Sequence, residues 1–159
     1  MNDSKQLSSD LREKWHAEAQ LLSKTSYITF AVTSRTARQI DTKGIAACIR
    51  ECIATNLKKL ALDPDDCRVL LDGSLKAPAV YKNQETIIKG DSKEKIISLA
   101  SVIAKVQRDH FMVALHKKHP QYDWNKNKGY GTAAHIRAIH HHGITPLHRQ
   151  TFLQRILDK

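Results

Sequence analysis

The fold class of this 159-residue chain is indicated by two short runs, Cys67-Arg68-Val69-Leu70-Leu71-Asp72-Gly73 and Thr86-Ile87-Ile88-Lys89-Gly90-Asp91. Both are rich in large apolar residues, and they predict short buried strands over residues 67–71 and 86–89. Each run then delivers an aspartate near the carboxyl end of its strand. Open α/β sheets usually place their ligand crevice at that edge, so the two aspartates are the first candidates for a functional site.

Helical patterns surround the two runs. Ser8 or Ser9 can cap a helix that has Leu11 and Trp15 on its apolar face. A second helix, about five turns long, is predicted from an apolar stripe at helical spacing, and it ends before Pro64. The stripe consists of Ile45, Ile49, Ile53, Leu57 and Leu60.

Three further elements complete the outline. Residues 27–33 are rich in β-branched and aromatic side chains and predict another strand. A long helix is expected from Glu94 to about Lys118, and a final helix starts after Thr132 and stops at Gly143. The inward candidates of the long helix include Ile97, Ala100, Ala104, Phe111 and Leu115. Helices thus alternate with short strands, and we expect a single α/β domain that spans the whole chain.

The composition fits one globular domain, because 41% of the residues are apolar and 6% are aromatic. A chain of this length buries roughly 70% of its unfolded surface, which is enough for a core without disulfides or structural metal. No apolar run approaches the roughly 18 residues of a membrane span, and the first residues contain no apolar stretch typical of a signal peptide. We expect a cytoplasmic protein with three ordinary thiols, at Cys48, Cys52 and Cys67.

Positive charge is concentrated toward the carboxyl end. The sequence has 26 Lys and Arg against 16 Asp and Glu, for a net charge of +10. Residues 61–100 hold six basic and seven acidic residues, whereas residues 101–159 hold ten and three, together with eight of the nine histidines. A polyanion such as nucleic acid is the natural partner, although charge alone is equally compatible with a basic surface that only confers solubility.

Asp72 and Asp91 are the strongest candidates for chemistry. If their strands are parallel neighbours, the two carboxylates come close together, and like charges at short range raise one pKa or recruit a cation. Hard oxygen ligands with no nearby cysteine or histidine pattern favour Mg²⁺ or Mn²⁺ over Zn²⁺. Either aspartate alone is better explained as a turn or helix-capping residue. The pair, together with the basic segment, favours a metal site.

The histidines do not predict a zinc site. On a helix, His140, His141 and His142 point in directions about 100° apart, so they cannot chelate one ion together. His135 and His140 are five positions apart, whereas zinc-binding helices use a spacing of four, and no cysteine is near. We interpret these residues, with His148, as a solvated and partly cationic helix face.

Six short blocks along the chain carry a family resemblance. They are Asn2-Asp3-Ser4-Lys5-Gln6-Leu7-Ser8, Leu70-Leu71-Asp72-Gly73, Ile88-Lys89-Gly90-Asp91-Ser92, Ala100-Ser101-Val102-Ile103-Ala104-Lys105-Val106-Gln107-Arg108-Asp109, Lys128-Gly129-Tyr130-Gly131-Thr132 and His148-Arg149-Gln150-Thr151-Phe152. In this order and with these gaps, the chain resembles ribonuclease HII over essentially its whole length. The resemblance implies an RNase H-like fold, with a mixed sheet flanked by helices and a helical carboxyl-terminal region.

The resemblance also implies an activity. Members of the family use Mg²⁺ or Mn²⁺ to cut the RNA strand of RNA–DNA hybrids, including single ribonucleotides embedded in duplex DNA. Asp72 and Asp91 match two of the family's four active-site carboxylates, which hold two metal ions for a hydrolysis that leaves a 5′-phosphate. Tyr130 resembles the tyrosine that stacks on the deoxyribose beyond the RNA-to-DNA junction, although without the resemblance it is better explained as a turn residue. The candidate phosphate contacts, or alternatively solvated ion pairs, are Lys5, Lys105, Arg108 and Arg149.

The amino end departs from the family pattern. The family begins with a strand that carries Asp-Glu-x-Gly-Arg-Gly and then a second apolar strand, and this sequence starts beyond both, with no Asp-Glu pair anywhere. In the family's sheet order, 3-2-1-4-5, residues 27–33, 67–71 and 86–89 become the third, fourth and fifth strands. Two carboxylates alone form a small ligand set for two ions. We therefore expect a misassigned start or a piece of a longer reading frame, and a monomer when complete.

Three functional interpretations stay open. The first is a ribonuclease HII whose sequence is truncated. The second is a noncatalytic remnant that still binds hybrid or duplex nucleic acid through its basic half. The third is a basic structural protein in which Asp72 and Asp91 are only turn residues, so that replacing each by asparagine leaves its function intact.

Overall fold

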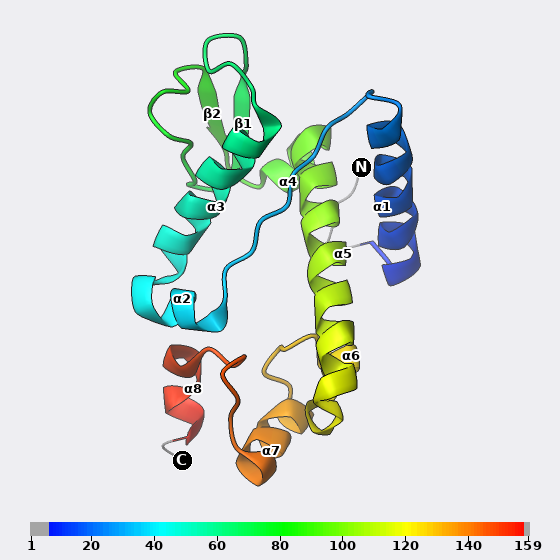
Figure 1. Ribbon diagram of the computed structural model, residues 1–159, viewed down its shortest axis with the longest axis vertical. Coiled ribbons are helices and arrows are strands. Elements are labelled where there is room, and N and C mark those ends of the chain that lie inside the picture. The colour runs from blue at the N-terminus through cyan, green and yellow to red at the C-terminus, as the bar shows by residue number, and fades with distance from the viewer. Residues whose placement is uncertain (1–6, 158–159) are drawn as a thin grey trace. The chain divides into compact units, whose positions relative to one another are not determined.

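Two strands pair in parallel and form the only sheet within residues 7–157, the part of the chain that this computed structural model describes (Figure 1). Strand β1 (Val69–Asp72) lies beside β2 (Gln84–Ile87), with Val69 opposite Gln84 and Asp72 opposite Ile87. The predicted neighbourhood of the two apolar runs is therefore confirmed. Most of the remaining described residues are helical, which is consistent with the expected α/β class.

Both strands are displaced from their predicted boundaries, which were 67–71 and 86–89. β1 starts at Val69, whose backbone nitrogen donates to the carbonyl of Asn83 at 2.9 Å. β2 ends at Ile87 because Ile88 is 72% exposed and Lys89 has a positive φ of 56°. A left-handed residue turns the chain out of the extended conformation, so the ladder cannot continue.

The prediction of a strand over residues 27–33 is wrong. Residues 28–36 have no regular secondary structure, and β1 and β2 pair only with each other in the described part of the chain. Two contacts from the Lys59 ammonium group hold the segment, to the carbonyl of Val32 at 3.4 Å and to the hydroxyl of Thr33 at 3.2 Å. β-Branched and aromatic side chains favour a strand because they pack well on the surface of a sheet. Without a neighbouring strand to pair with, a segment of this composition does not form a strand.

Two of the amino-terminal helices match their sequence signals. Helix α1 (Ser9–Lys24) is capped by Ser8, whose hydroxyl accepts from Leu11 N at 3.2 Å. Helix α3 (Ile45–Leu60) has the bounds that the apolar stripe predicts. Helix α2 (Ala37–Lys43) was not predicted, although Thr36 and Gln39 form a capping box at its start.

The chain divides into two compact units, each with its own core. The first comprises Met1–Ser34 and Ile49–Val106, and its core contains Leu57, Leu71, Ala77 and Tyr81. The second comprises Arg35–Cys48 and Gln107–Lys159, and its core contains Met112, Tyr122, Trp124 and Ile139.

The carboxyl-terminal half is helical, as expected. After the single turn α4 (Gly90–Lys93), the long helix α5 (Lys95–Lys118) agrees closely with its prediction. It is followed by η1 (Pro120–Tyr122), α6 (Trp124–Asn127), α7 (Ala133–His142) and α8 (Gln150–Leu157). Thr132 and Gly143 bound α7 as predicted. The prediction that this helix is the final one is wrong, because α8 follows it. None of the helices within residues 7–157 is long and apolar enough to cross a membrane.

The inward face of α5 is only partly the predicted one. Ile97 is buried and Leu115 is partly buried against the second core, but Ala100, Ala104 and Phe111 are exposed. The ring of Phe111 lies under the Arg108 guanidinium, 5.7 Å from its carbon atom, so this aromatic residue covers a cation instead of filling the core. The buried apolar positions of the helix are Ile97, Val102, Ile103, Val106 and Met112.

Candidate functional site

The end of β1 fixes the first candidate residue. Asp72 is the last residue of the strand, and Gly73 N continues the ladder by donating to the carbonyl of Ile87 at 3.0 Å. One carboxylate oxygen of Asp72, Oδ1, accepts from the backbone nitrogen of Gly90 at 2.8 Å. The side chain is therefore held in place by the segment that carries the second aspartate.

The turn after β2 places Asp91 near the same edge of the sheet. Lys89 adopts the left-handed conformation and starts α4, and Asp91 lies in the first turn of that helix. Gly90 is buried between the two elements, and a Cβ atom there would approach Ile97 Cδ1 to 2.7 Å. A side chain at Gly90 would thus displace the end of Ile97, and its Cβ atom would lie 3.4 Å from Asp72 Oδ1.

Asp72 and Asp91 line one open cavity of about 370 Å³ within the first unit. Its wall is mainly apolar, with Leu71, Ile97 and Ala100 among the lining residues. The two aspartates thus line the same cavity, as neighbouring parallel strands would have them do. Both side chains are half-buried, which leaves them accessible to a ligand in the cavity.

The two carboxylates are the right type of ligand for a divalent cation, but they are fewer than such an ion needs. Hard oxygen ligands are those that Mg²⁺ and Mn²⁺ prefer, but these ions take about six ligands, and several of them must come from water, substrate or further protein groups. The described residues contain no cluster of three or more Asp, Glu, His or Cys side chains that could hold an ion. Within residues 7–157, Asp72 and Asp91 are the candidate ligands for a metal at this edge.

Two polar residues that were not singled out also line the cavity. Arg68 precedes β1, and its guanidinium is paired with Glu85 across the strand pair. Ser101, a residue of α5, also lines the cavity. The signals were present in the sequence, because Arg68 stands next to the β1 run and Ser101 lies in the fourth motif block.

A second group of predicted residues gathers in the second unit. Partial burial is the main cause that lowers the pKa of the Arg108 guanidinium, and the positive charge of Arg149 lowers it further. Tyr130 has the opposite effect and raises the pKa of Arg108. A Cβ atom at Gly129 would lie 3.6 Å from Arg108 Nη2. We call Arg108, Tyr130 and Arg149 the cationic patch.

Arg149 is fixed by its neighbours at the start of α8. Its guanidinium carbon lies 3.9 Å from the centre of the Phe152 ring, a close cation–π contact. Asp41 accepts from Gln150 N at 2.8 Å and from Thr151 N at 3.1 Å, so a residue of α2 caps α8. The Thr151 hydroxyl, these amides and the nearby charge of Arg149 together lower the pKa of Asp41.

The other basic candidates are less informative. Lys105 is a half-buried residue of α5 in the first unit, and its side chain or backbone already interacts within the protein. Lys5 lies outside the described residues.

The interpretation of the histidines needs a correction. His140, His141 and His142 are exposed, as expected for a solvated face. His135 and His148 are buried instead, at 4% and 7% exposure, because the rings of Tyr122 and Trp124 pack around them. No zinc-type cluster forms in the described part of the chain.

Paired carboxylates beyond parallel strands, together with a cationic and aromatic surface, are the arrangement expected of a protein that acts on phosphodiesters. Comparison with known proteins defines the class further. The family model of ribonuclease HII matches residues 1–155. The chain therefore belongs to the ribonuclease HII family, as its sequence motifs predict.

Individual relatives agree with this assignment. A ribonuclease HII of Clostridium perfringens is 40% identical over 157 residues, which cover 99% of this chain and 55% of the relative. That of Endomicrobium trichonymphae is 40% identical over 152 residues, covering 96% of this chain and 70% of the relative. The chain thus spans about half the length of the clostridial relatives that it matches.

Proposed function

We propose that this chain carries part of the active site and part of the substrate-binding surface of a metal-dependent ribonuclease HII. The substrates are RNA–DNA hybrids and DNA duplexes with embedded ribonucleotides, and the RNA strand is cut to leave a 5′-phosphate. One observation carries the proposal, namely that Asp72 and Asp91 line a single cavity at the carboxyl end of the parallel strand pair. Membership of the family supports the reaction class.

Asp72 and Asp91 would hold Mg²⁺ or Mn²⁺ through their carboxylate oxygens. Two bound divalent ions lower the pKa of an attacking water and stabilise the charge that develops on the leaving 3′ oxygen. The hydrogen bond from Gly90 N orients one oxygen of Asp72 and leaves the other oxygen for a cation. Arg68, in the same cavity, can pair with a phosphate of the substrate strand.

The cationic patch contributes binding rather than bond cleavage. The Tyr130 side chain is 65% exposed and can stack on a deoxyribose, while Arg108 and Arg149 contact backbone phosphates. The charge of Arg149 lowers the pKa of Arg108, which reflects repulsion between the two guanidinium groups. This supports the role in binding, because a phosphate placed between them relieves that repulsion. Lys5 and Lys105 are proposed as further phosphate contacts.

Two carboxylates supply few ligands for two ions, so the 159-residue chain is expected to cleave poorly by itself. The test uses a labelled duplex with one ribonucleotide in Mn²⁺ or Mg²⁺, and it compares this chain with the same chain extended through its upstream reading frame. Cleavage by the extended chain, lost in Asp72→Asn, supports the proposal. Full cleavage by the 159 residues alone shows that two carboxylates suffice, and a fully active Asp72→Asn variant overturns the metal site.

A second candidate is a noncatalytic protein that binds hybrid or duplex nucleic acid. It is favoured by the net charge of +10 and by the small acidic ligand set in the described residues. Tight binding that weakens steeply with salt, without cleavage in either form of the chain, selects this alternative. We propose that the complete protein is a cytoplasmic monomer. Size-exclusion chromatography tests the oligomeric state.

A further inference from the structure

A buried cluster of two histidines and two aromatic rings in the second unit has no part in the proposed cleavage chemistry. Tyr122 and Trp124 are stacked with ring centres 5.0 Å apart, and the His148 ring lies 4.9 Å from Tyr122. His135 meets the edge of Trp124 at 6.4 Å. Imidazole groups in so apolar a setting are stable only when they are hydrogen-bonded and uncharged.

The hydrogen bonds of His135 define its protonation state. Its Nδ1 lies 3.0 Å from the carbonyl oxygen of Tyr130, and because a carbonyl can only accept, the proton is on Nδ1. Its Nε2 lies 3.1 Å from the indole nitrogen of Trp124, which can only donate, so Nε2 is the acceptor. Both ring nitrogens are therefore satisfied in one neutral tautomer.

The same reasoning applies to His148. Its Nδ1 accepts from the backbone nitrogen of Thr145 at 3.0 Å, which places the proton of the neutral ring on Nε2. This Nε2 lies 3.4 Å from Nε2 of His135. A second proton on His135 would meet the Trp124 donor, and a second proton on His148 would meet the Thr145 donor. Protonation of His135 therefore sets two donors against each other, whereas at His148 the Thr145 hydroxyl, 3.0 Å from Nδ1, can accept from the protonated ring.

The surrounding groups disfavour protonation as well. Burial is the main cause that lowers the pKa of His148, and the neighbouring His135 and His119 lower it further, whereas the backbone hydrogen bond with Thr145 raises it. His119, which precedes η1, packs against Trp124 at 5.5 Å, and His142 of α7 packs against Tyr122 at 6.3 Å. A positive charge on any of these histidines opposes another charge on the pair.

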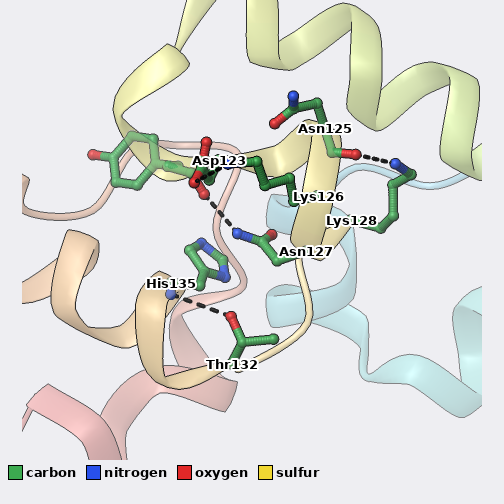
Figure 2. A network of polar contacts seen from close by, with 8 residues as sticks. Asp123, Asn125, Lys126, Asn127, Lys128, Thr132 and His135 are labelled. Carbon is green, nitrogen blue, oxygen red and sulfur yellow. Dashed lines mark hydrogen bonds and ion pairs between the residues drawn. The ribbon is translucent and has the colours of Figure 1, made fainter.

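The network ends at the backbone of the Tyr130 segment. The Tyr130 carbonyl accepts from His135 and also from Thr132 N, the latter at 2.8 Å. Tyr130 N donates to the carbonyl of Asn127, also at 2.8 Å. The buried Asn127 side chain also donates to the carbonyl of Tyr122 at 2.7 Å (Figure 2). In the same view, His135 N lies against the hydroxyl of Thr132. Tyr130 thus combines an anchored main chain with an exposed ring.

We propose that His135 is a positioning residue, which holds the Tyr130 backbone so that its ring is presented to nucleic acid, and that protonation of the His135–His148 pair in acid releases this segment. The inference rests on the proposed function in one respect, namely that Tyr130 touches the nucleic acid. Acidification thereby weakens the contact between Tyr130 and the nucleic acid. The rising positive charge of the protein has the opposite effect, because it strengthens binding to nucleic acid.

The test measures how much Tyr130 contributes to binding at each pH. The dissociation constant of a labelled hybrid is measured for the intact chain and for Tyr130→Ala, between about pH 7.5 and about pH 5. Charge attraction acts on both proteins and cancels in the ratio of the two constants. We expect a ratio of about tenfold at neutral pH that falls toward one in acid. A ratio above one that stays constant over this range overturns the acid release.

Two substitutions at position 135 separate the donor from the acceptor. In His135→Asn, an uncharged amide nitrogen stands near the position of Nδ1, so the ratio is expected to persist in acid. In His135→Gln, the amide reaches toward Trp124 and the donor to Tyr130 is lost, so the ratio is expected to fall about two- to tenfold at neutral pH. His140→Asn, an exposed change on the same helix, is expected to follow the unmodified chain. Equal ratios for the Asn and Gln variants overturn the positioning role.

A second measurement distinguishes this inference from the proposed function. Exchange of the amide hydrogens of Tyr130 and Thr132 is expected to accelerate in acid and in His135→Gln beyond the intrinsic rate change, whether or not nucleic acid binds. A binding ratio of one at neutral pH shows that Tyr130 does not touch the hybrid, which refutes that part of the proposed function. Unchanged amide protection in His135→Gln refutes the anchoring by His135 itself.

Discussion

The backbone nitrogen of Gly90 donates to Oδ1 of Asp72 across 2.8 Å, so the start of α4 is bonded directly to the last residue of β1. A Cβ atom at Gly90 would lie 3.4 Å from the same Asp72 oxygen and 2.7 Å from Cδ1 of the buried Ile97. The contact that orients the first carboxylate therefore depends on a residue without a side chain.

Replacing Gly90 with alanine is expected to lower the free energy of unfolding by about 1 kcal/mol, because the added methyl group displaces the end of the buried Ile97 side chain. Denaturant titration measures the change. Ile97→Val removes the clashing Cδ1 atom, so the double variant is expected to be less destabilised than the sum of the single variants. Gly131→Ala is the control, since nothing lies within 4 Å of a Cβ atom there. Strict additivity of the two changes would contradict the clash.

Asp72→Asn is expected to separate activity from stability. Asparagine keeps an oxygen that can accept from Gly90 N, so the free energy of unfolding should change by less than about 0.5 kcal/mol. Loss of the negative charge should reduce metal-dependent cleavage in the extended chain at least about a hundredfold, and Asp91→Asn should behave alike. Asp66→Asn, an exposed change in a turn, is the control for charge. A parallel loss of stability and activity would point to a structural role for Asp72.

The two arginines of the cationic patch should act through salt-dependent binding. In Arg108→Ala and in Arg149→Ala, the slope of log K against log salt is expected to fall by about 0.9 each, if each guanidinium neutralises one phosphate. Fluorescence anisotropy of a labelled hybrid over a salt series measures the slope. Arg137→Ala, an exposed change on α7, should leave the slope unchanged. The same reduction in all three variants would indicate a diffuse effect of net charge instead.

The cap of α8 by Asp41 should give stability that depends on pH. The Thr151 hydroxyl and two backbone amides hold the pKa of Asp41 below its usual value near 3.8. Because the folded pKa is the lower one, this stability is complete above the ordinary pKa and is lost as the pH falls toward the folded value. Asp41→Ala is expected to cost about 1 kcal/mol at neutral pH and less in acid. A cost that is independent of pH would refute the cap as its source.

Local patterns predicted the elements whose signals lie within a few residues. The stripe from Ile45 to Leu60 specifies α3 to the residue, and Thr132 and Gly143 specify both ends of α7. That Asp72 and Asp91 line one cavity was also predictable, because ligands of α/β sheets bind beyond the carboxyl ends of parallel strands, where Asp72 ends β1 and Asp91 follows β2 in α4. In each case the deciding interactions join positions near one another in the chain or follow from strand direction.

Interactions between distant positions account for what the sequence analysis missed. The start of α8 is capped by Asp41, which lies 109 positions before Gln150, so no window around residue 150 contains that signal. His135 and His148 resemble their exposed neighbours in type, and only the packing of Tyr122 and Trp124 buries them. Residues 27–33 have the composition of a strand, but no described strand pairs with them.

The parallel pair β1–β2 has a consequence for the order of folding. Parallel strands are usually joined through a helix, but Asp72 and Gln84 are joined by a short loop, which Gln84 holds through bonds to Ala77 N and the Tyr81 carbonyl. Closing a loop of about ten residues takes on the order of 10–100 ns. The carboxylate pair is thus encoded in one continuous stretch, and we expect it to assemble early, before α8 finds its distant cap.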